Sequence, residues 1–381
     1  MKFVAATILD VHIPLRTPLQ TARGPIVSRA GLWLGLELEG TITGWGETLP
    51  LPGFGLEPAE KSREVLEELT ERLVGRDFSA PGPLLDELEP LTERAPGARA
   101  ALDLALHDLA ARIDGVSLAR WLARQDGRDP HKSVRIAALI GGEEPDATAH
   151  AASTAERAGF RTIKLKIGGR DFDRDLARVT AVRHALRSDM ALRLDANGAW
   201  SVAEAKERLR ALEPFDIAFV EQPTAPEDHA ALAGLRAESN IPLAADESLG
   251  DEFDAEALLA RGACDVLVVK PAVVGGLRSA FRIALRARAF EIPVVVTSFL
   301  DSSLGRTAAL HLVASLAGEI PAAGLATGSF LADDPVSPRL PDAPELVVPV
   351  DPGLGCAPDS RTLRSGDTSD EFDHAPPEQR S

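Results

Sequence analysis

The sequence predicts an α/β protein in which a barrel of parallel βα units follows a smaller α+β domain. Acids and lysines recur at nearly constant intervals, at positions 195, 221, 246 and 270, and each directly follows a short apolar run. Helix-like segments such as 203–212 lie between these runs. A strand, a helix and two short loops fit such an interval, which indicates successive parallel βα units. The carboxyl ends of barrel strands converge at one mouth, where this architecture keeps its chemistry.

An α+β domain over about residues 1 to 125 is expected to precede the barrel. Apolar and polar residues alternate at the start of the chain, which is typical of half-buried strands, and helical patterns follow. The polar segment 17–28 is predicted to be a mobile loop, and 49–55 is too rich in proline and glycine for regular structure. The predicted elements are strands over 2–15, 32–39 and 42–48, and helices over 58–73, 83–91 and 98–113.

The barrel is predicted to occupy residues 126–334. Its predicted strands are 134–140, 163–166, 191–194, 217–220, 241–244, 266–269 and 293–298, with an eighth near 324–326. After Asp334 the chain is rich in proline with short apolar pieces, which indicates a return to the first domain over about 335–360. Residues 362–381 are polar and acidic, and we expect a disordered tail there.

Composition excludes several classes of partner. The chain has 381 residues, 45% of them apolar and 26% charged, as expected for a soluble globular protein with a large core. Its net charge of −17 argues against nucleic acid and anionic membranes, because both need a basic face. Cys264 and Cys356 form neither a disulfide framework nor a metal spacing. No secretory signal or membrane-spanning segment is evident in the sequence, so we expect a cytoplasmic location. The sequence leaves open whether the protein forms a homo-oligomer.

Three acids and three lysines at the predicted barrel mouth point to one kind of chemistry. Carboxylates on three successive strands form the hard-oxygen set that Mg²⁺ prefers. A cation that binds a substrate carboxylate stabilises the enediolate formed when a lysine removes the α-proton. A nearby divalent cation also lowers the pKa of a lysine towards the range of a general base. The acids are Asp195, Glu221 and Asp246, and the lysines, among only seven in the chain, are Lys164, Lys166 and Lys270.

Neighbouring residues have both functional and structural interpretations. Lys164 is either a group that tunes Lys166 or an ion-pair partner of a nearby acid, and Asn197 either orients the site or makes a turn. Arg193 points to the same face as Asp195 by strand alternation, so it should line the barrel interior, with an acid or the substrate as its partner. Glu247 is interpreted as a salt-bridge residue beside the site rather than a metal ligand.

Together, Lys-x-Lys, the three acids on consecutive strands and Lys270-Pro271 resemble the enolase superfamily, in particular its muconate-lactonizing-enzyme subgroup. The resemblance covers residues 1 to about 350. It implies a modified (β/α)₇β barrel with an α+β capping domain, and Mg²⁺ held by the three acids. It also implies that Lys166 and Lys270 act on opposite faces of a small carboxylate substrate, with Lys164 tuning Lys166.

Within this subgroup, several local strings look most like o-succinylbenzoate synthase of menaquinone synthesis. The strings are 44–47, 51–54, 192–197 and 301–305. That resemblance implies a lyase reaction, in which Lys166 removes the α-proton and then helps to expel a β-hydroxyl, while the charge of Lys270 stabilises the enediolate. It places Thr297 and Ser298 at the succinyl carboxylate, and it implies that the capping loops 17–29 and 50–57, with Phe54, close over the substrate.

Three related activities share the same site residues. Dipeptide epimerases and N-succinylamino-acid racemases exchange a proton between two lysines, and muconate cycloisomerases use the same constellation. Dipeptide epimerases usually carry Asp-x-Asp near the eighth strand, whereas residues 324–330 here contain no acid. A non-catalytic barrel that binds a small acid is the rival from another class, but the complete set of lysines and carboxylates favours an enzyme.

Overall fold

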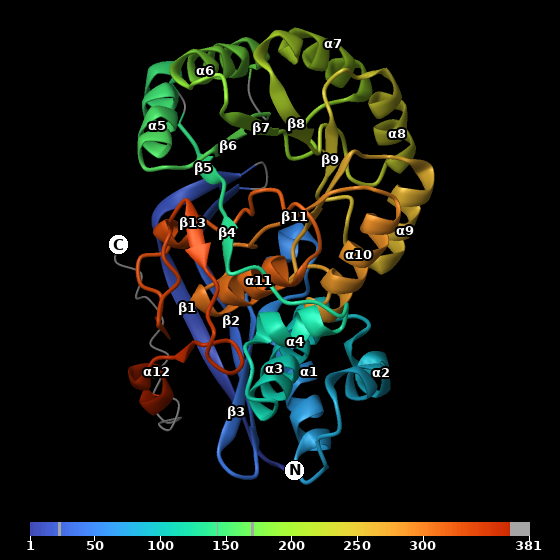
Figure 1. The fold of residues 1–381 in the computed structure, drawn as a ribbon, viewed down its shortest axis with the longest axis vertical. Helices are drawn as coiled ribbons and strands as arrows, with labels where there is room; N and C mark the ends of the chain where they lie inside the picture. Colours follow the sequence, from blue (N-terminus) through green and yellow to red (C-terminus); the bar gives the residue numbers. More distant parts are fainter. Residues whose placement is uncertain (22–23, 143, 169–170, 366–381) are drawn as a thin grey trace, which may run out of the picture.

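The computed structural model describes residues 1–21, 24–142, 144–168 and 171–365. Its first part is an antiparallel sheet with helices on one side (Figure 1). The strands are β1 (Phe3–Thr21), β2 (Gly24–Leu38) and β3 (Ile42–Thr48), and the helices are α1 (Ala59–Leu73), α2 (Pro81–Thr92), α3 (Pro96–Ile113) and α4 (Leu118–Arg124). Alternate leucines of β2, among them Leu34 and Leu36, are fully buried against these helices. The sequence had predicted all of these elements except α4.

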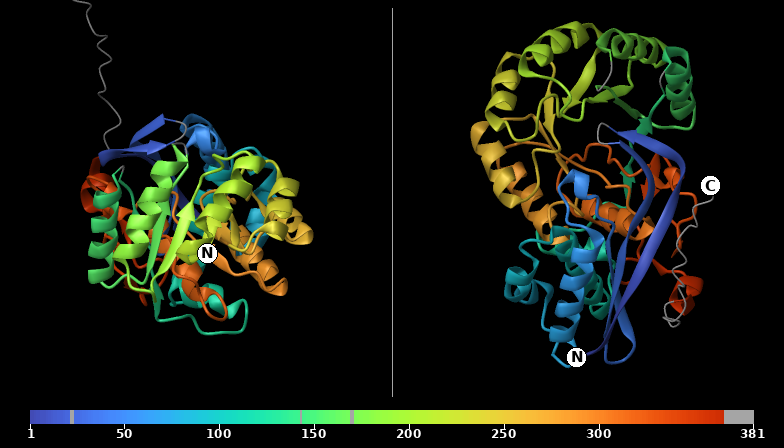
Figure 2. Two further views of the ribbon diagram at one scale, coloured as in Figure 1. Left: turned by 90° about the horizontal axis from the view of Figure 1, so that it is seen from above. Right: turned by 180° about the vertical axis from the view of Figure 1, so that it is seen from behind.

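The mobile loop expected over 17–28 is wrong. Strands β1 and β2 continue almost to the tip of one long hairpin, where Leu19 pairs with Ile26 and Thr21 with Gly24. Polar composition suggested a loop, but cross-strand pairing satisfies the backbone of this segment irrespective of its side chains. Seen from behind, the hairpin extends from the capping helices up to the barrel (Figure 2).

The second part is a curled parallel sheet with helices outside it, which confirms the predicted fold class (Figure 1). Seven strands follow one another in chain order across the sheet. They are β5 (Ala138–Ile140), β6 (Thr162–Lys166), β7 (Ala191–Asp195), β8 (Ile217–Glu221), β9 (Leu243–Ala245), β10 (Val266–Val269) and β11 (Val294–Val296). The outer helices are α5 (Pro145–Arg157), α6 (Phe172–Ala185), α7 (Val202–Leu212), α8 (His229–Glu238), α9 (Glu252–Arg261), α10 (Leu277–Ala289) and α11 (Ser303–Ser315).

Both ends of the predicted barrel differ in detail from the expectation. The strand predicted over 134–140 splits, because β4 (Ser133–Arg135) pairs antiparallel with β13 (Glu345–Val347) while β5 opens the parallel sheet. The predicted eighth strand forms only isolated bridges, Ala323 with Ile136 and Gly324 with Thr297. These bridges join the two edges of the sheet, so short backbone contacts close the barrel.

After the barrel, the chain makes backbone contacts with the capping part. Gly353 bridges Ser117, and the backbone N–H of Leu354 donates to Asp108 on α3 at 2.7 Å. The short elements of this return are β12 (Val336–Ser337), β13, β14 (Ala357–Pro358) and α12 (Ser360–Ser365). The tail expected from residue 362 therefore begins within α12, and the remainder, 366–381, lies outside the described residues. No helix in the described ranges has the length and apolar character needed to cross a membrane.

Candidate active site

One pocket at the carboxyl ends of the barrel strands brings together all the predicted site residues. It encloses a cavity of about 130 Å³. The capping part also contributes, because Leu19 and Ile26 of the β1–β2 hairpin and Leu51 line it as well. The predicted residues in its wall are Phe54, Lys164, Lys166, Arg193, Asp195, Asn197, Glu221, Asp246, Lys270, Thr297 and Ser298.

The three acids lie side by side because their strands are neighbours in register. Asp195 and Glu221 end β7 and β8 and are directly paired, and Asp246 follows β9. Their exposed fractions are only 1%, 2% and 4%. Burial and the negative charges of Asp195 and Asp246 raise the pKa of Glu221 well above its ordinary value. Burial and the neighbouring negative charges therefore both favour the protonated form of Glu221.

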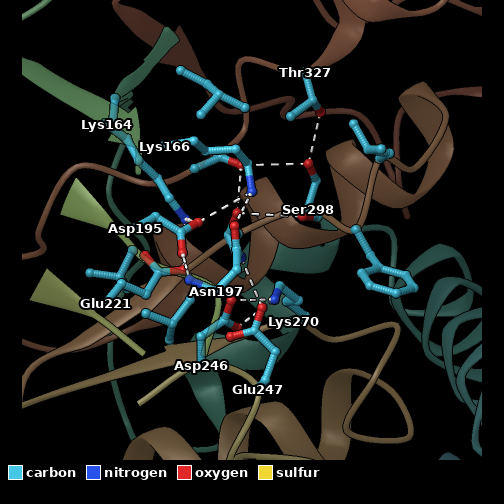
Figure 3. A pocket seen from close by; sticks show the side chains of 18 of the residues that line it. Lys164, Lys166, Asp195, Asn197, Glu221, Asp246, Glu247, Lys270, Ser298 and Thr327 are labelled. Atoms are coloured by element: carbon cyan, nitrogen blue, oxygen red, sulfur yellow. Dashed lines mark hydrogen bonds and ion pairs between the residues drawn. The ribbon is translucent and has the colours of Figure 1, made fainter. Parts of the chain in front are cut away.

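Lys164 lies at the centre of this cluster. Its Nζ is 2.9 Å from Asp195 Oδ2 and 2.6 Å from Glu221 Oε1 (Figure 3). Burial alone would lower the pKa of Lys164, but the surrounding carboxylates outweigh burial and raise it. Of the two interpretations of Lys164, the ion-pair role is the one that these contacts describe.

Lys166 and Lys270 approach the acids from different sides. Lys166 ends β6 and Lys270 follows β10, with β7, β8 and β9 between them in the sheet. Lys166 Nζ donates to Asn197 Oδ1 at 2.9 Å and is 3.4 Å from Asp195 Oδ2, whereas Lys270 Nζ donates to both oxygens of Asp246. Figure 3 shows the two amines on either side of Asn197.

The pKa of Lys270 in this structure is raised, whereas the sequence predicted a lowered pKa. Burial would lower the pKa of Lys270, but the charges of Asp246 and Glu247 outweigh burial and raise it. A divalent cation beside the amine would lower this pKa, as expected from the sequence. The acids by themselves have the opposite effect.

The donor set fits a hard divalent cation in chemistry. All three candidate ligands are carboxylates, and a bound cation would offset both causes of the raised pKa of Glu221, which are burial first and then the neighbouring negative charges. As they stand, however, no three His, Cys, Asp or Glu side chains of the described ranges are arranged around a common point for a metal. Lys164 and Lys270 form ion pairs with oxygens of all three acids.

The other predicted residues differ in what they contact. Arg193 lines the pocket, where it donates to the carbonyl oxygen of Ala322 at 2.7 Å and lies 5.0 Å from the ring of Phe219, and the acid that interacts with it electrostatically is Glu221. Thr297 Oγ1 donates to the carbonyl oxygen of Gly324 at 2.9 Å, which helps to close the barrel. The hydroxyl oxygens of Ser298 and Thr327 are 2.7 Å apart in the pocket wall.

Asn197 lies in a turn and contacts both a candidate metal ligand and a lysine. Its backbone has φ +46°, as in a tight turn, and its N–H donates to Asp195 Oδ1 at 3.1 Å. Its side chain accepts from Lys166 and donates from Nδ2 to Glu247 Oε1 at 2.9 Å. Glu247 is thus a hydrogen-bonded neighbour of the site, as the sequence suggested.

Two residues that shape the site were missed. Gln222 is fully buried, and its Oε1 accepts from the backbone N–H groups of Asp246 and Ser248, so it fixes the turn after β9. Phe299 packs edge-on against Phe54 at 6.3 Å and lies 6.0 Å from Lys270 Nζ. Their positions in the sequence, next to Glu221 and Ser298, are the only signal that could have indicated them.

Comparison with known proteins decides the family. Residues 3–122 match the mandelate racemase / muconate lactonizing enzyme N-terminal domain, and residues 146–362 match the enolase C-terminal domain-like family. A D-Ala-D/L-Ala epimerase of Cytophaga hutchinsonii is 31% identical over 79% of this chain and 80% of its own length. The chain belongs to the enolase superfamily.

Other relatives of this enolase-superfamily chain have related activities. An N-succinyl-L-Arg/Lys racemase of Bacillus cereus is 26% identical over 83% of the chain and 85% of its own length, and chloromuconate cycloisomerases are also among the relatives. The crystal structure of a dipeptide epimerase from Enterococcus faecalis, complexed with Mg and L-Leu-L-Tyr, superposes with a TM-score of 0.88 at 29% identity. That alignment covers 94% of this chain and all of the epimerase.

Proposed function

We propose that the protein is a Mg²⁺-dependent racemase or epimerase that exchanges the proton α to the carboxylate of an N-acylated amino acid or dipeptide. The observation that carries this proposal is the placement of Lys166 and Lys270, with three strands between them in the sheet and both amines directed at one carboxylate cluster. Two amines on two sides of a bound α-carbon can remove a proton from one face and return one to the other.

The proposed reaction balances without a co-reactant. One lysine, as the free amine, takes the α-proton and becomes an ammonium group, and the pair of electrons from the broken C–H bond moves into the carboxylate as an enolate. The other lysine, as an ammonium group, donates its proton to the opposite face and becomes a free amine. The product is the epimer of the substrate, and the two lysines have exchanged protonation states.

Mg²⁺ is assigned to Asp195, Glu221 and Asp246. Bound there, it would supply positive charge that stabilises the enolate and disfavours an extra proton on the nearby amines. Lys164, already paired with two of these acids, would keep the carboxylates ordered and add positive charge next to Lys166.

The N-terminal side of the substrate is proposed to carry an amide in place of a free ammonium group. Near Thr297 and Ser298, the pocket wall consists of Gly324, Ala326 and Thr327, none of which carries charge. A free dipeptide would bring an ammonium group to this wall, whereas an N-acyl group would bring a neutral amide. The N-succinyl racemase among the relatives supports the acyl alternative.

The direct test is α-proton exchange in D₂O. The protein with Mg²⁺ would be incubated with each enantiomer of a panel of N-acetyl- and N-succinylamino acids and with dipeptides, and followed by proton NMR and chiral chromatography. We expect loss of the α-proton signal together with appearance of the opposite enantiomer. Absence of exchange across the whole panel would reject the proposal.

Dehydration by an o-succinylbenzoate synthase reaction is the second candidate. It is favoured by the strings that resemble that enzyme, and the structure gives two of them neighbouring positions, since Glu47 of one accepts from Ser302 of the other. It requires only one lysine as base and acid, with Lys270 as a fixed cation. Formation of an aromatic ultraviolet product from the cyclohexadiene substrate, without exchange in amino-acid derivatives, would favour it.

A further inference from the structure

A fully buried arginine joins the capping part to the loop that follows β11. Arg29, on β2, has an exposed fraction of 0%. Its Nη2 donates to the carbonyl oxygens of Leu49 and, at 3.2 Å, of Phe299, and its Nε donates to that of Leu300 at 3.2 Å. Burial lowers the pKa of Arg29 to about 10, and its Nη1 has no partner within the described residues. Burying a guanidinium group this completely is costly, and hydrogen bonds together with the negative charges of Asp301 and Glu47 offset part of that cost.

The segment that Arg29 holds is fixed tightly and adopts an unusual backbone. Leu300 has φ +57°, a left-handed conformation that a branched residue rarely adopts. On its two sides, Asp301 accepts from the backbone N–H of Phe299 at 2.8 Å, and the backbone N–H of Ser302 donates to Glu47 at 3.1 Å. The loop is therefore determined by contacts from β2 and β3 and does not depend on its own sequence alone.

This loop presents one aromatic ring to one of the two lysines. The Phe299 ring lies 6.0 Å from Lys270 Nζ and 5.5 Å from the guanidinium carbon of Arg29, and it packs on Phe54. A cation at such a distance from a ring is attracted by the ring's electrostatic quadrupole, and for Lys270 this attraction adds to the ion pair with Asp246. The side of the pocket that contains Lys270 thus depends on the position of Phe299.

The side that contains Lys166 has a different support. Arg178, on α6 and only 4% exposed, donates from Nη2 to the backbone carbonyl of Lys166 at 3.0 Å and forms an ion pair with Asp175 at 2.7 Å. Asp175 in turn accepts from the N–H of Gly168 at 2.7 Å. Arg178 thus contacts the backbone of Lys166 directly, whereas Arg29 contacts the loop whose Phe299 ring faces Lys270.

We propose that Arg29 is a positioning residue for the Lys270 face of the reaction. Arg29 fixes the carbonyl groups of Phe299 and Leu300 against β2. The Phe299 ring is thereby held in the position from which it keeps Lys270 Nζ directed at the α-carbon. The inference rests on the proposed function, because it assigns Arg29 to one of the two proton transfers. It makes Arg178 the corresponding residue for the Lys166 face.

The experiment measures same-face α-proton exchange separately for the two enantiomers of an N-acylamino acid in D₂O. The Lys270→Ala variant identifies which enantiomer exchanges through Lys166. We compare Arg29→Lys and Arg178→Lys, each of which keeps the charge but loses the planar fork. Arg286→Lys on the exposed surface of α10 is the matched control, since its partner is Glu256 on α9. Racemisation requires both lysines and should fall in both buried variants, so face-specific exchange is the informative readout.

For Arg29→Lys, we expect kcat for exchange on the Lys270 face to fall at least about tenfold, because small misplacement of a catalytic group is costly. Exchange on the Lys166 face should stay within about twofold of the wild-type rate, because Arg29 does not position Lys166. Arg178→Lys should show the reverse pattern, and Arg286→Lys neither effect. Equal loss on both faces in Arg29→Lys, or no loss on either, would refute the role of Arg29.

Phe299→Leu provides a second route if Arg29→Lys fails to fold, as judged by circular dichroism. Loss of the ring should reduce exchange on the Lys270 face alone, and an unchanged rate on that face would refute the inference. Failure of the proposed function is distinguishable, because the unmodified protein would then exchange neither enantiomer.

Discussion

At the scale of single residues, the site is an arrangement of opposing charges whose protonation states depend on their neighbours. The carboxylates raise the pKa of Lys164 and Lys270, and burial together with the same carboxylates raises that of Glu221. A lysine that acts as a base near neutral pH needs a lower pKa than these carboxylates give it. Positive charge bound at the three acids would lower that pKa. That dependence connects the metal assignment with the assignment of the two bases.

Substitution of either base is expected to stop racemisation but leave exchange on one face. Lys166→Ala and Lys270→Ala should each lower the racemisation rate by about 10³-fold, within the range of a lost general acid–base group. Each variant should still exchange the α-proton of one enantiomer, and the two variants should favour opposite enantiomers. Loss of both exchanges in Lys270→Ala with the fold intact would instead make Lys270 essential for binding.

His311 predicts how stability depends on pH. It is fully buried on α11, accepts from the N–H of Ala119 at Nδ1, and donates from Nε2 to the carbonyl of Leu354. Burial lowers its pKa to about 4, below the ordinary value of 6.5. The folded state therefore binds the proton less readily than the unfolded state, so stability is present above about pH 6.5 and is lost as pH falls towards 4.

Urea unfolding of the wild type and of His311→Gln would check this dependence. Between about pH 7 and pH 5, the wild type should lose about 2 kcal/mol more than the variant, because glutamine cannot be protonated there. Equal losses would mean that other groups account for the acid sensitivity.

At the scale of elements, close packing of β3 on α3 explains the string Gly44-Trp45-Gly46-Glu47. A Cβ on Gly46 would lie 1.9 Å from the carbonyl oxygen of Ala101, and one on Gly44 would lie 2.4 Å from that of Ala105. Because strand residues alternate between faces, Glu47 then lies on the same face as Trp45, away from α3, where it accepts from Ser302. The two glycines thus let β3 pack directly on α3, while Glu47 on the opposite face contacts Ser302 of the barrel.

Gly46→Ala is expected to destabilise the protein by about 3 kcal/mol or more, since the clash is with backbone and not with a movable side chain. Gly82→Ala in α2 is the matched control, because a Cβ there would meet nothing within 4 Å. The control should be neutral or slightly stabilising. Thermal denaturation of both variants would measure the difference, and a Gly46→Ala protein as stable as the control would contradict the packing argument.

At the scale of the whole molecule, the pocket belongs to neither part alone. Leu19, Ile26 and Phe54 come from the capping part, whereas the acids and lysines come from the barrel. Binding at the acids should consequently stabilise the entire fold.

Mg²⁺ should raise the melting temperature. At a concentration of about 100 times its Kd, a ligand that binds only the native state adds about 2.7 kcal/mol to the free energy of unfolding. We expect EDTA to reverse the increase and Glu221→Gln to abolish it, because the variant lacks one of the three carboxylates. Lys206→Gln, on the exposed surface of α7, should retain the full increase. A Glu221→Gln protein with an undiminished increase would move the metal elsewhere.

The alternation of short apolar runs with helical segments determined the fold class, because the periodicity of a segment can be read from that segment alone. The same regularity placed Lys166, Asp195, Glu221, Asp246 and Lys270 at strand ends, and parallel strands in register necessarily bring such ends together. Tertiary structure alone decided the length of the β1–β2 hairpin, the split of 134–140 and the roles of Arg29, Gln222 and Phe299. Each of these depends on a contact with a residue far away in the chain. Such a contact produces no repeating sequence pattern in either of the two segments.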